Sequence, residues 1–174
     1  MKDISIVTAL DIRSPNSLDG AKVWELVRNS RKLDLNSSYF YVAMSHWFSD
    51  SCKVAFDTEN NQLIGAVIGF RLPSDKETLF IWQIAVDEQY RGQSIAMRLL
   101  EEVAASSEIR YVEATIAPSN FSSQRLFDKW SSSHKTTMKV SDGFGLNCFP
   151  NQQHEQENLY RIGPLEWNKT IKGE

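Results

Sequence analysis

The sequence predicts an α/β fold, more fully an α+β arrangement in which a mixed central sheet has helices on both faces. Residues 78–86, TLFIWQIAV, are apolar on both faces, which is typical of a central strand. A helical pattern at 92–106 and a strand pattern at 110–117 follow, and this order predicts a crossover between two parallel strands. The earlier strands have short connections, so we expect them to pair antiparallel.

A single globular domain covering residues 1–174 is expected, because 41% of the residues are hydrophobic, 24% are charged, and no Pro/Gly/Ser-rich linker interrupts the chain. The formal net charge of −3, with no basic stripe among aromatics, argues against a nucleic-acid partner. The apolar stretches are far too short for a membrane span, and the N-terminus lacks the apolar core of a signal peptide, so we expect a cytoplasmic protein. Cys52 and Cys148 are isolated and are expected to be free thiols.

The first elements are predicted to be a strand followed by a helix. Residues 4–13, ISIVTALDIR, indicate the strand. Asn16 and Ser17 are residue types that cap helices, and a helical pattern follows them. The apolar positions of this helix are Leu18, Val23, Trp24 and Val27.

A second helix and a hairpin are predicted next. The helix covers about 38–48, and the face that we expect to be shared consists of Tyr39, Val42, Ala43 and His46. Residues 52–58 and 63–72 then indicate two strands joined at Asn60-Asn61.

The C-terminal half is predicted to contain the crossover, one more helix and a last strand. Residues 92–106 give the strongest helical pattern of the chain. The break at 118–120 ends the strand at 110–117, and 121–131 is again helical. A last strand is possible at 157–165. The inward positions of the two helices are Ile95, Ala96, Leu99, Leu100, Val103, Ala104, Leu126, Phe127 and Trp130.

The hexapeptide RGQSIA, residues 91–96, lies where the central strand passes into the following helix. A helix beginning near Gly92 directs unpaired N–H groups and the positive end of its dipole outward, and this favours an anion. Small residues allow a pyrophosphate to approach the backbone, and Arg91 adds a full positive charge. The alternative is an ordinary helix start with Arg91 solvated.

This hexapeptide resembles the Arg/Gln-x-x-Gly-x-Gly/Ala loop of the GNAT superfamily of acetyl-CoA-dependent N-acetyltransferases. QIAVDEQYRG resembles the central strand before that loop, and Asn120 followed by RLFDKW resembles a later segment beside the thiol of coenzyme A. The resemblance implies a GNAT fold with one parallel strand pair splayed at the coenzyme A site, and a backbone donor to the thioester at Val86. The positions that it implies for acetyl-CoA binding are Ile84, Ala85, Val86, Arg91, Gly92, Gln93, Ser94, Ile95, Ala96 and Asn120.

A closer resemblance covers nearly the whole chain and is to the L-2,4-diaminobutyrate acetyltransferase family of ectoine synthesis. It implies acetyl transfer to the 4-amino group of L-2,4-diaminobutyrate by a homodimer, without a metal. The matching segments, in order, are SLDGAKVWELV, LDLNSSYFY, HWF, TLFIWQIAVDEQYRGQSIA, EATIAPSNFSS and HEQENLYRIGP.

Two residues depart from the superfamily pattern. Ser94 stands where the loop usually has glycine, and a serine there is strained if its φ is positive. Phe127 stands where many members have a tyrosine that protonates the departing thiolate, and a phenylalanine cannot donate a proton. The identity of the acid is therefore open.

Glu113 is the predicted catalytic base. It alternates with Tyr111 and Thr115 on a strand expected beside residues 82–86. A carboxylate within a core strand is costly to bury without a partner, and a cationic amine is a natural partner. The alternative is an edge position, or an ion pair with an arginine such as Arg110 or Arg125.

The predicted acceptor-binding residues are polar or aromatic. For several of them an ordinary structural role is an alternative to substrate binding. Gln83 binds substrate or satisfies a buried backbone group, and Trp82 is a pocket wall or a core residue. Asp34 and Asn36 face the substrate or cap the next helix. The resemblance implies substrate contact for the full set, which is Asp34, Asn36, Tyr39, Trp82, Gln83, His154 and Glu157.

The segment HEQE, residues 154–157, also invites a metal interpretation, but no second histidine and no H-E-x-x-H accompany it. Arg161 pairs either with an acidic residue or with the substrate carboxylate. Two other functions stay open: a GNAT enzyme for another diamino acid or a polyamine, and a coenzyme A-binding module without catalysis.

Overall fold

The computed structural model describes residues 9–105, 109–150 and 154–167. The chain divides into two compact units, of which the first comprises residues 1–71 and 81–107 and the second comprises 72–80 and 108–174. Strand β4 (Asp75–Val86) is shared, because the boundary falls between Phe80 and Ile81. The expectation of one domain stays a prediction. Among the described residues, no helix has the length and hydropathy that crossing a membrane requires.

The first unit holds the N-terminal strands and three helices. Strand β1 (Leu10–Arg13) pairs antiparallel with β2 (Lys53–Asp57), and β2 pairs antiparallel with β3 (Gln62–Leu72). The antiparallel hairpin predicted from the sequence is therefore confirmed. The helices of this unit are α1 (Asp19–Ser30), α2 (Ser38–Trp47) and α3 (Ile95–Ala105), with short 3-10 helices η1 (Ser49–Ser51) and η2 (Glu88–Tyr90).

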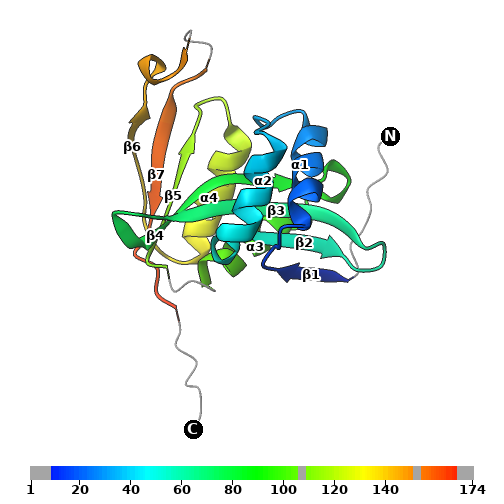
Figure 1. Ribbon diagram of the computed structural model, residues 1–174. Helices are drawn as coiled ribbons and strands as arrows, with labels where there is room; N and C mark the ends of the chain where they lie inside the picture. The colour runs from blue at the N-terminus through cyan, green and yellow to red at the C-terminus, as the bar shows by residue number, and fades with distance from the viewer. Residues whose placement is uncertain (1–8, 106–108, 151–153, 168–174) are drawn as a thin grey trace. The chain divides into compact units, whose positions relative to one another are not determined.

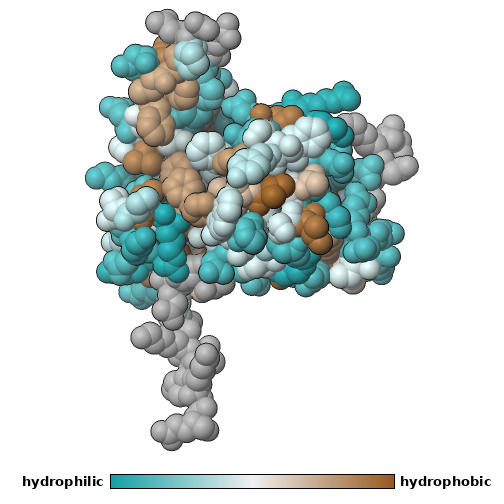
Figure 2. All heavy atoms as spheres, in the orientation of Figure 1, coloured by the Kyte–Doolittle hydropathy of each residue, from teal (hydrophilic) through white to brown (hydrophobic). Residues whose placement is uncertain are grey.

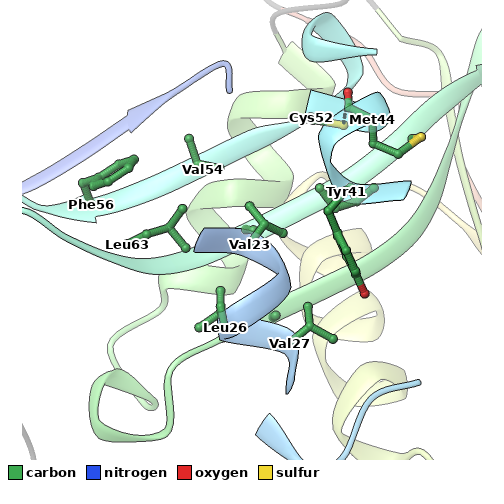
Figure 3. Close-up of a cluster of buried hydrophobic side chains, with 12 residues drawn as sticks. Val23, Leu26, Val27, Tyr41, Met44, Cys52, Val54, Phe56 and Leu63 are labelled. Atoms are coloured by element: carbon green, nitrogen blue, oxygen red, sulfur yellow. Dashed lines mark hydrogen bonds between the residues drawn. The ribbon is translucent and has the colours of Figure 1, made fainter. Parts of the chain in front are cut away.

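Helices α1 and α2 cover one face of these strands and lie side by side in front of them (Figure 1). They come very close, since a Cβ built on Gly20 would lie 2.6 Å from the Cα of Val42. Figure 3 shows the buried cluster between these helices and the sheet. Its labelled members are Val23, Leu26, Val27, Tyr41, Met44, Cys52, Val54, Phe56 and Leu63.

Helix α3 covers the other face. Ala55 alternates with the core residues Val54 and Phe56 along β2, so its side chain points to the opposite side. A Cβ built on Gly65 would meet the side chains of Ile95 and Leu99 at 3.1 and 3.0 Å. The prediction of helices on both faces is therefore confirmed in this unit.

The second unit holds β5 (Tyr111–Ile116), α4 (Phe121–Ser133), β6 (Met138–Phe144), η3 (Leu146–Cys148) and β7 (Glu157–Ile162). Thr78–Phe80 of β4 pair in parallel with Tyr111–Glu113 of β5, as the crossover predicts. Strand β7 pairs antiparallel with both β5 and β6. The hydrogen-bonded order of the seven strands is β1-β2-β3-β4-β5-β7-β6, which confirms a mixed sheet with β4 at its centre.

Strand β6 has no counterpart among the predicted elements. Its sequence MKVSDGF contains Asp-Gly, a turn signal, and all its residues after Met138 are exposed. It forms because β7 supplies its hydrogen-bonding partners. Apolar side chains gather on the exposed surface of the β6–β7 hairpin (Figure 2), among them Val140, Phe144 and Leu146.

Two local expectations were wrong. Helix α3 begins at Ile95 rather than near Gly92, because Gly92 and Ser94 both have positive φ, which a helix cannot contain. The buried face of α2 consists of Tyr41, Met44 and Ser45, whereas Tyr39 is exposed. Of the two alternatives for Asp34 and Asn36, capping of α2 is excluded, because Ser37 is the N-cap and its side chain accepts a hydrogen bond from the N–H of Phe40. The predicted strand at 4–13 lies partly outside the described residues.

The two cysteines are free thiols in very different surroundings. Cys52 is fully buried in the core of the first unit, where burial raises the pKa of its thiol to about 12. Cys148 is exposed in η3 of the second unit. The prediction of two unpaired thiols is confirmed.

Candidate active site

A hydrogen-bonded network fixes the loop between α1 and α2 to strand β4 in the first unit. The Tyr41 hydroxyl donates to Oε1 of Gln83 at 2.9 Å, and Nε2 of Gln83 donates to the backbone carbonyl of Asp34 at 2.9 Å. The backbone N–H of Asn36 donates to the Tyr41 hydroxyl at a longer 3.4 Å. The amide of Gln83 therefore hydrogen-bonds a backbone carbonyl, and its contact with substrate stays a prediction.

Aromatic side chains surround this loop without being buried. Trp82 is 48% exposed and Tyr39 is 69% exposed, so core packing does not explain either residue. The Phe40 ring lies 5.6 Å from the Trp82 ring, between centroids. The loop and these aromatic residues form a polar and aromatic surface on the first unit, and such surfaces suit a small cationic ligand.

The loop at residues 91–96 contains two residues with a left-handed backbone conformation, Gly92 and Ser94. Gly92 has φ of 82° and a Cβ built on it would meet no atom within 4 Å, so the space beside it is open. Ser94 has φ of 59°, which is the strained case for a serine. Nε of Arg91 donates to the carbonyl of Val86 at 3.4 Å and so joins the loop to the end of β4. Backbone strain of this kind concentrates where ligands are held.

The end of β4 presents its residues alternately to two faces. Ala85 belongs to the core beneath α1 and α2, so only its backbone is available to a ligand. Ile84 and Val86 are half-buried. The loop that follows is held by the N–H of Asp87, which donates to the carbonyl of Ile64 at 2.8 Å. Gln93 is half-buried and Ser94 is exposed, and the first turn of α3 follows them with Ile95 and Ala96.

In the second unit, Glu113 is 8% exposed and accepts a hydrogen bond from the Arg161 guanidinium. Arg161 also lies 3.5 Å from Oδ2 of Asp75 and 4.0 Å from the centre of the Tyr111 ring. Burial lowers the pKa of Arg161, but the hydrogen bonds to Glu113 and Asp75 and their charges outweigh it and raise that pKa. The arginine that pairs with Glu113 is thus neither Arg110 nor Arg125, the residues expected for that alternative.

The register of the sheet places Glu113 opposite Phe80 of β4, two residues before Trp82, and opposite Arg161 of β7. The expectation that this strand lies beside residues 82–86 was therefore two or more residues out of register. Asp75 at the start of β4 accepts a hydrogen bond from the Thr78 hydroxyl at 2.6 Å, and this bond lowers the pKa of its carboxyl.

His154 and Glu157 lie together at the start of β7. Nε2 of His154 is 3.9 Å from Oε1 of Glu157, and its ring stacks on Phe149 with 4.2 Å between centroids. Nδ1 lies 2.7 Å from the carbonyl oxygen of Glu155, and a carbonyl only accepts, so Nδ1 bears a proton. Among the described residues, no group of three or more acidic, histidine or cysteine side chains is arranged to hold a metal.

Asn120 is the N-cap of α4, because its side chain accepts from the N–H of Ser123 at 3.1 Å. Glu155 holds the turn before it through the hydroxyl and the N–H of Ser119, at 2.5 and 3.3 Å. Phe127 is buried in α4. Glu155 could not be predicted from the sequence, since neither its spacing nor its neighbours form a motif.

A family model described as Acetyltransferase (GNAT) family matches residues 21–131, which is more than half of the chain. This chain belongs to the GNAT family. The GNAT fold expected from the sequence is thereby confirmed.

Individual GNAT relatives agree in more detail. L-2,4-diaminobutyric acid acetyltransferase from Shouchella clausii is 44% identical over 159 residues, which is 90% of this chain and 88% of that protein. The enzyme of the same name from Marinococcus halophilus is also 44% identical, over 91% of this chain and 92% of its own. A solved structure of diaminobutyrate acetyltransferase EctA from Paenibacillus lautus, in complex with L-2,4-diaminobutyric acid and coenzyme A, has a TM-score of 0.85. It is 37% identical and covers 92% of this chain and 98% of its own.

Proposed function

We propose that this GNAT enzyme transfers the acetyl group of acetyl-CoA to the 4-amino group of L-2,4-diaminobutyrate. The product is N4-acetyl-L-2,4-diaminobutyrate, the intermediate from which ectoine is formed. The single observation that supports this best is the likeness, over 92% of this chain, to a structure that holds diaminobutyric acid and coenzyme A. The two relatives that are 44% identical to this chain are both named for that activity.

The reaction needs a neutral amine. The acceptor amine has a pKa near that of lysine, about 10.4, so removing its proton at pH 7 costs about 4–5 kcal/mol. A base or a proton-relaying water within hydrogen-bond reach lowers the barrier. We assign this role to Glu113, whose buried carboxylate accepts a hydrogen bond from Arg161.

The thioester carbonyl of acetyl-CoA gathers negative charge as the amine attacks, and a preorganised N–H donor stabilises it. We assign that donor to the backbone of Val86, at the end of β4. The loop at 91–96 binds the diphosphate of acetyl-CoA through backbone N–H groups, and Arg91 contributes charge. Asn120 assists at the thiol end through the part of its amide that does not cap α4.

Selectivity requires the α-ammonium group of the acceptor to be held apart from the reacting amine. Two acidic side chains, Asp34 and Glu157, suit that ammonium, and Nε2 of His154 lies 3.9 Å from Oε1 of Glu157. Trp82 and Tyr39 are the exposed aromatic residues available to pack on the methylene chain. Asn36 completes the loop surface beside Asp34.

The deciding experiment measures thiol release from acetyl-CoA with L-2,4-diaminobutyrate and then locates the acetyl group by NMR. Acetylation at the 4-nitrogen is expected. A panel of other diamino acids and polyamines separates this function from that of a GNAT enzyme with a different acceptor. Binding of acetyl-CoA without thiol release, for every amine, would identify a non-catalytic module.

A cytoplasmic homodimer stays a prediction from the resemblance. Light scattering after size-exclusion chromatography of the full chain measures the assembly, for which the dimer mass is expected. A monomer mass across a hundredfold range of concentration would contradict it.

A further inference from the structure

The hydroxyl of Tyr41 is a polar atom at the edge of an apolar core. Tyr41 has no exposed surface, and its ring packs among Val23, Val27 and Met44. Figure 3 shows the hydroxyl at the end of the side chain that points away from Met44 and Cys52. A buried hydroxyl without a partner is costly, so its hydrogen bond to Gln83 fixes the orientation of both side chains.

Gln83 uses both ends of its amide within the protein. Its oxygen accepts from Tyr41, and its nitrogen donates to the carbonyl of Asp34. Two hydrogen bonds, each 2.9 Å long, therefore connect the core residue Tyr41 through Gln83 to the backbone of Asp34. The Asn36 N–H and side-chain amide lie 3.4 and 3.5 Å from the same hydroxyl, so the loop is held on both sides of Leu35.

The loop joins α1 to α2 and lies outside the regular secondary structure. Residues 31–37 form neither helix nor strand. Asp34 is exposed and Leu35 is 46% exposed, while Leu33 packs against the core. Because a fixed carbonyl fixes the adjoining peptide plane, the bond from Gln83 restricts the backbone at Asp34 and so limits the directions in which its side chain leaves the backbone.

We infer that Tyr41 and Gln83 are positioning residues that orient Asp34 for the acceptor amine. The inference rests on the proposed function, in which the Asp34 carboxylate binds the α-ammonium group. Neither Tyr41 nor Gln83 touches the substrate in this scheme. Their effect reaches the acceptor through the loop alone.

The test compares Tyr41→Phe with Tyr90→Phe. Both residues are buried in the first unit, and each hydroxyl donates one hydrogen bond to another side chain, that of Tyr41 to Gln83 at 2.9 Å and that of Tyr90 to Asp57 at 3.1 Å, so each variant loses this donated bond. At saturating acetyl-CoA, Tyr41→Phe is expected to raise the KM for diaminobutyrate about fivefold with kcat little changed, the effect of about one hydrogen bond. Tyr90→Phe is expected to leave that KM unchanged. Equal KM values for Tyr41→Phe and the unmodified enzyme would overturn the inference.

A second comparison asks whether Tyr41 acts through Asp34. In an Asp34→Asn background, adding Tyr41→Phe is expected to raise KM no further, because residues in one network are not additive. Additive increases would show that Tyr41 acts by another route. Gln83→Met, which removes both amide bonds at similar size, is expected to match Tyr41→Phe.

Hydrogen exchange separates failure of this inference from failure of the proposed function. Tyr41→Phe is expected to speed exchange of the amides in residues 33–36, and Tyr90→Phe is not. This measurement needs no acceptor, so it holds if the unmodified chain does not acetylate diaminobutyrate. Unchanged exchange in Tyr41→Phe would reject the positioning role even in an active enzyme.

Discussion

Arg161 and Glu113 face each other across the β5–β7 ladder, and the guanidinium donates a hydrogen bond to the carboxylate. Arg161 also reaches Asp75 and stacks on Tyr111. The carboxylate proposed as base is thus part of an ion pair that also stabilises the fold. Experiments on Glu113 must therefore measure activity and stability separately.

Glu113→Gln is expected to lower kcat about 100-fold, the usual range for loss of a positioned base, with little change in the KM for acetyl-CoA. The variant remains close in size and keeps a hydrogen-bond acceptor for Arg161. Steady-state kinetics at saturating substrates measures the change. A rise in acceptor KM with unchanged kcat would instead assign Glu113 to substrate binding.

Arg161→Met is the matched change on the other side of the pair. It leaves Glu113 buried without its partner, so the free energy of unfolding is expected to fall by about 1–3 kcal/mol. The range extends to low values because Arg161 is partly exposed, and solvent weakens its contribution to stability. Urea unfolding measures it, and a loss smaller than that of Glu113→Gln would show that the pair contributes little to stability.

Asp34→Asn is expected to raise the KM for diaminobutyrate about 10-fold or more and to leave the KM for acetyl-CoA unchanged, because the charge that holds the α-ammonium is removed. Asp11→Asn makes the same change at an exposed position on β1 and serves as the control. A lowered kcat with unchanged KM would exchange the roles proposed for Asp34 and Glu113.

Ser94→Gly is expected to stabilise the protein by about 0.5–1 kcal/mol, because glycine adopts the φ of 59° without strain. The KM for acetyl-CoA should be maintained, since the backbone N–H remains. Ser94→Val places a β-branched residue at positive φ and should both destabilise the protein and raise that KM. Thermal unfolding and steady-state kinetics report the two effects, and a destabilising Ser94→Gly would contradict the strain.

The Asp19–Arg13 pair predicts a pH dependence of stability. Burial raises the pKa of the Asp19 carboxyl, but hydrogen bonds from Arg13 and from the N–H of Asn16 outweigh it, and the folded pKa lies below its ordinary value of 3.8. A lowered folded pKa stabilises the protein fully above 3.8, and this stabilisation is lost as the pH falls from there through the folded value. Urea unfolding between pH 7 and pH 3 should therefore show Asp19→Asn approaching the unmodified protein at the acid end. A constant difference would exclude this linkage.

The crossover of β4, α3 and β5 could be predicted because an apolar run, a strong helical period and a second strand follow one another with clear breaks. Strand β6 could not, since its residues are exposed and its pairing with β7 supplies its stability. In α2 the aromatic residues Tyr39, Phe40 and Tyr41 are consecutive, so the pattern did not distinguish which one is buried. The sequence placed Tyr39 on the shared face of this helix, whereas the structure buries Tyr41 and exposes Tyr39.

In the candidate site, too, some features could be predicted from the sequence and others could not. The residue types at Asp34, Gln83 and Glu113 were recognisable as polar positions in unusual surroundings. Their partners were not, because Gln83 and Tyr41 are separated by 42 residues and Glu113 and Arg161 by 48. Contacts between segments so far apart depend on the sheet register, and a small register error moves every partner along the strand.

The buried thiol of Cys52 has a practical consequence for assays that detect free coenzyme A with thiol reagents. With a pKa of about 12, Cys52 contains almost no thiolate at neutral pH, and the core also excludes the reagent. The enzyme itself should then react with one equivalent of the thiol reagent, through the exposed Cys148. The Cys148→Ser variant should not react with the reagent, so it would add no background to the assay. The unmodified protein could carry a single fluorescent label at Cys148 on η3.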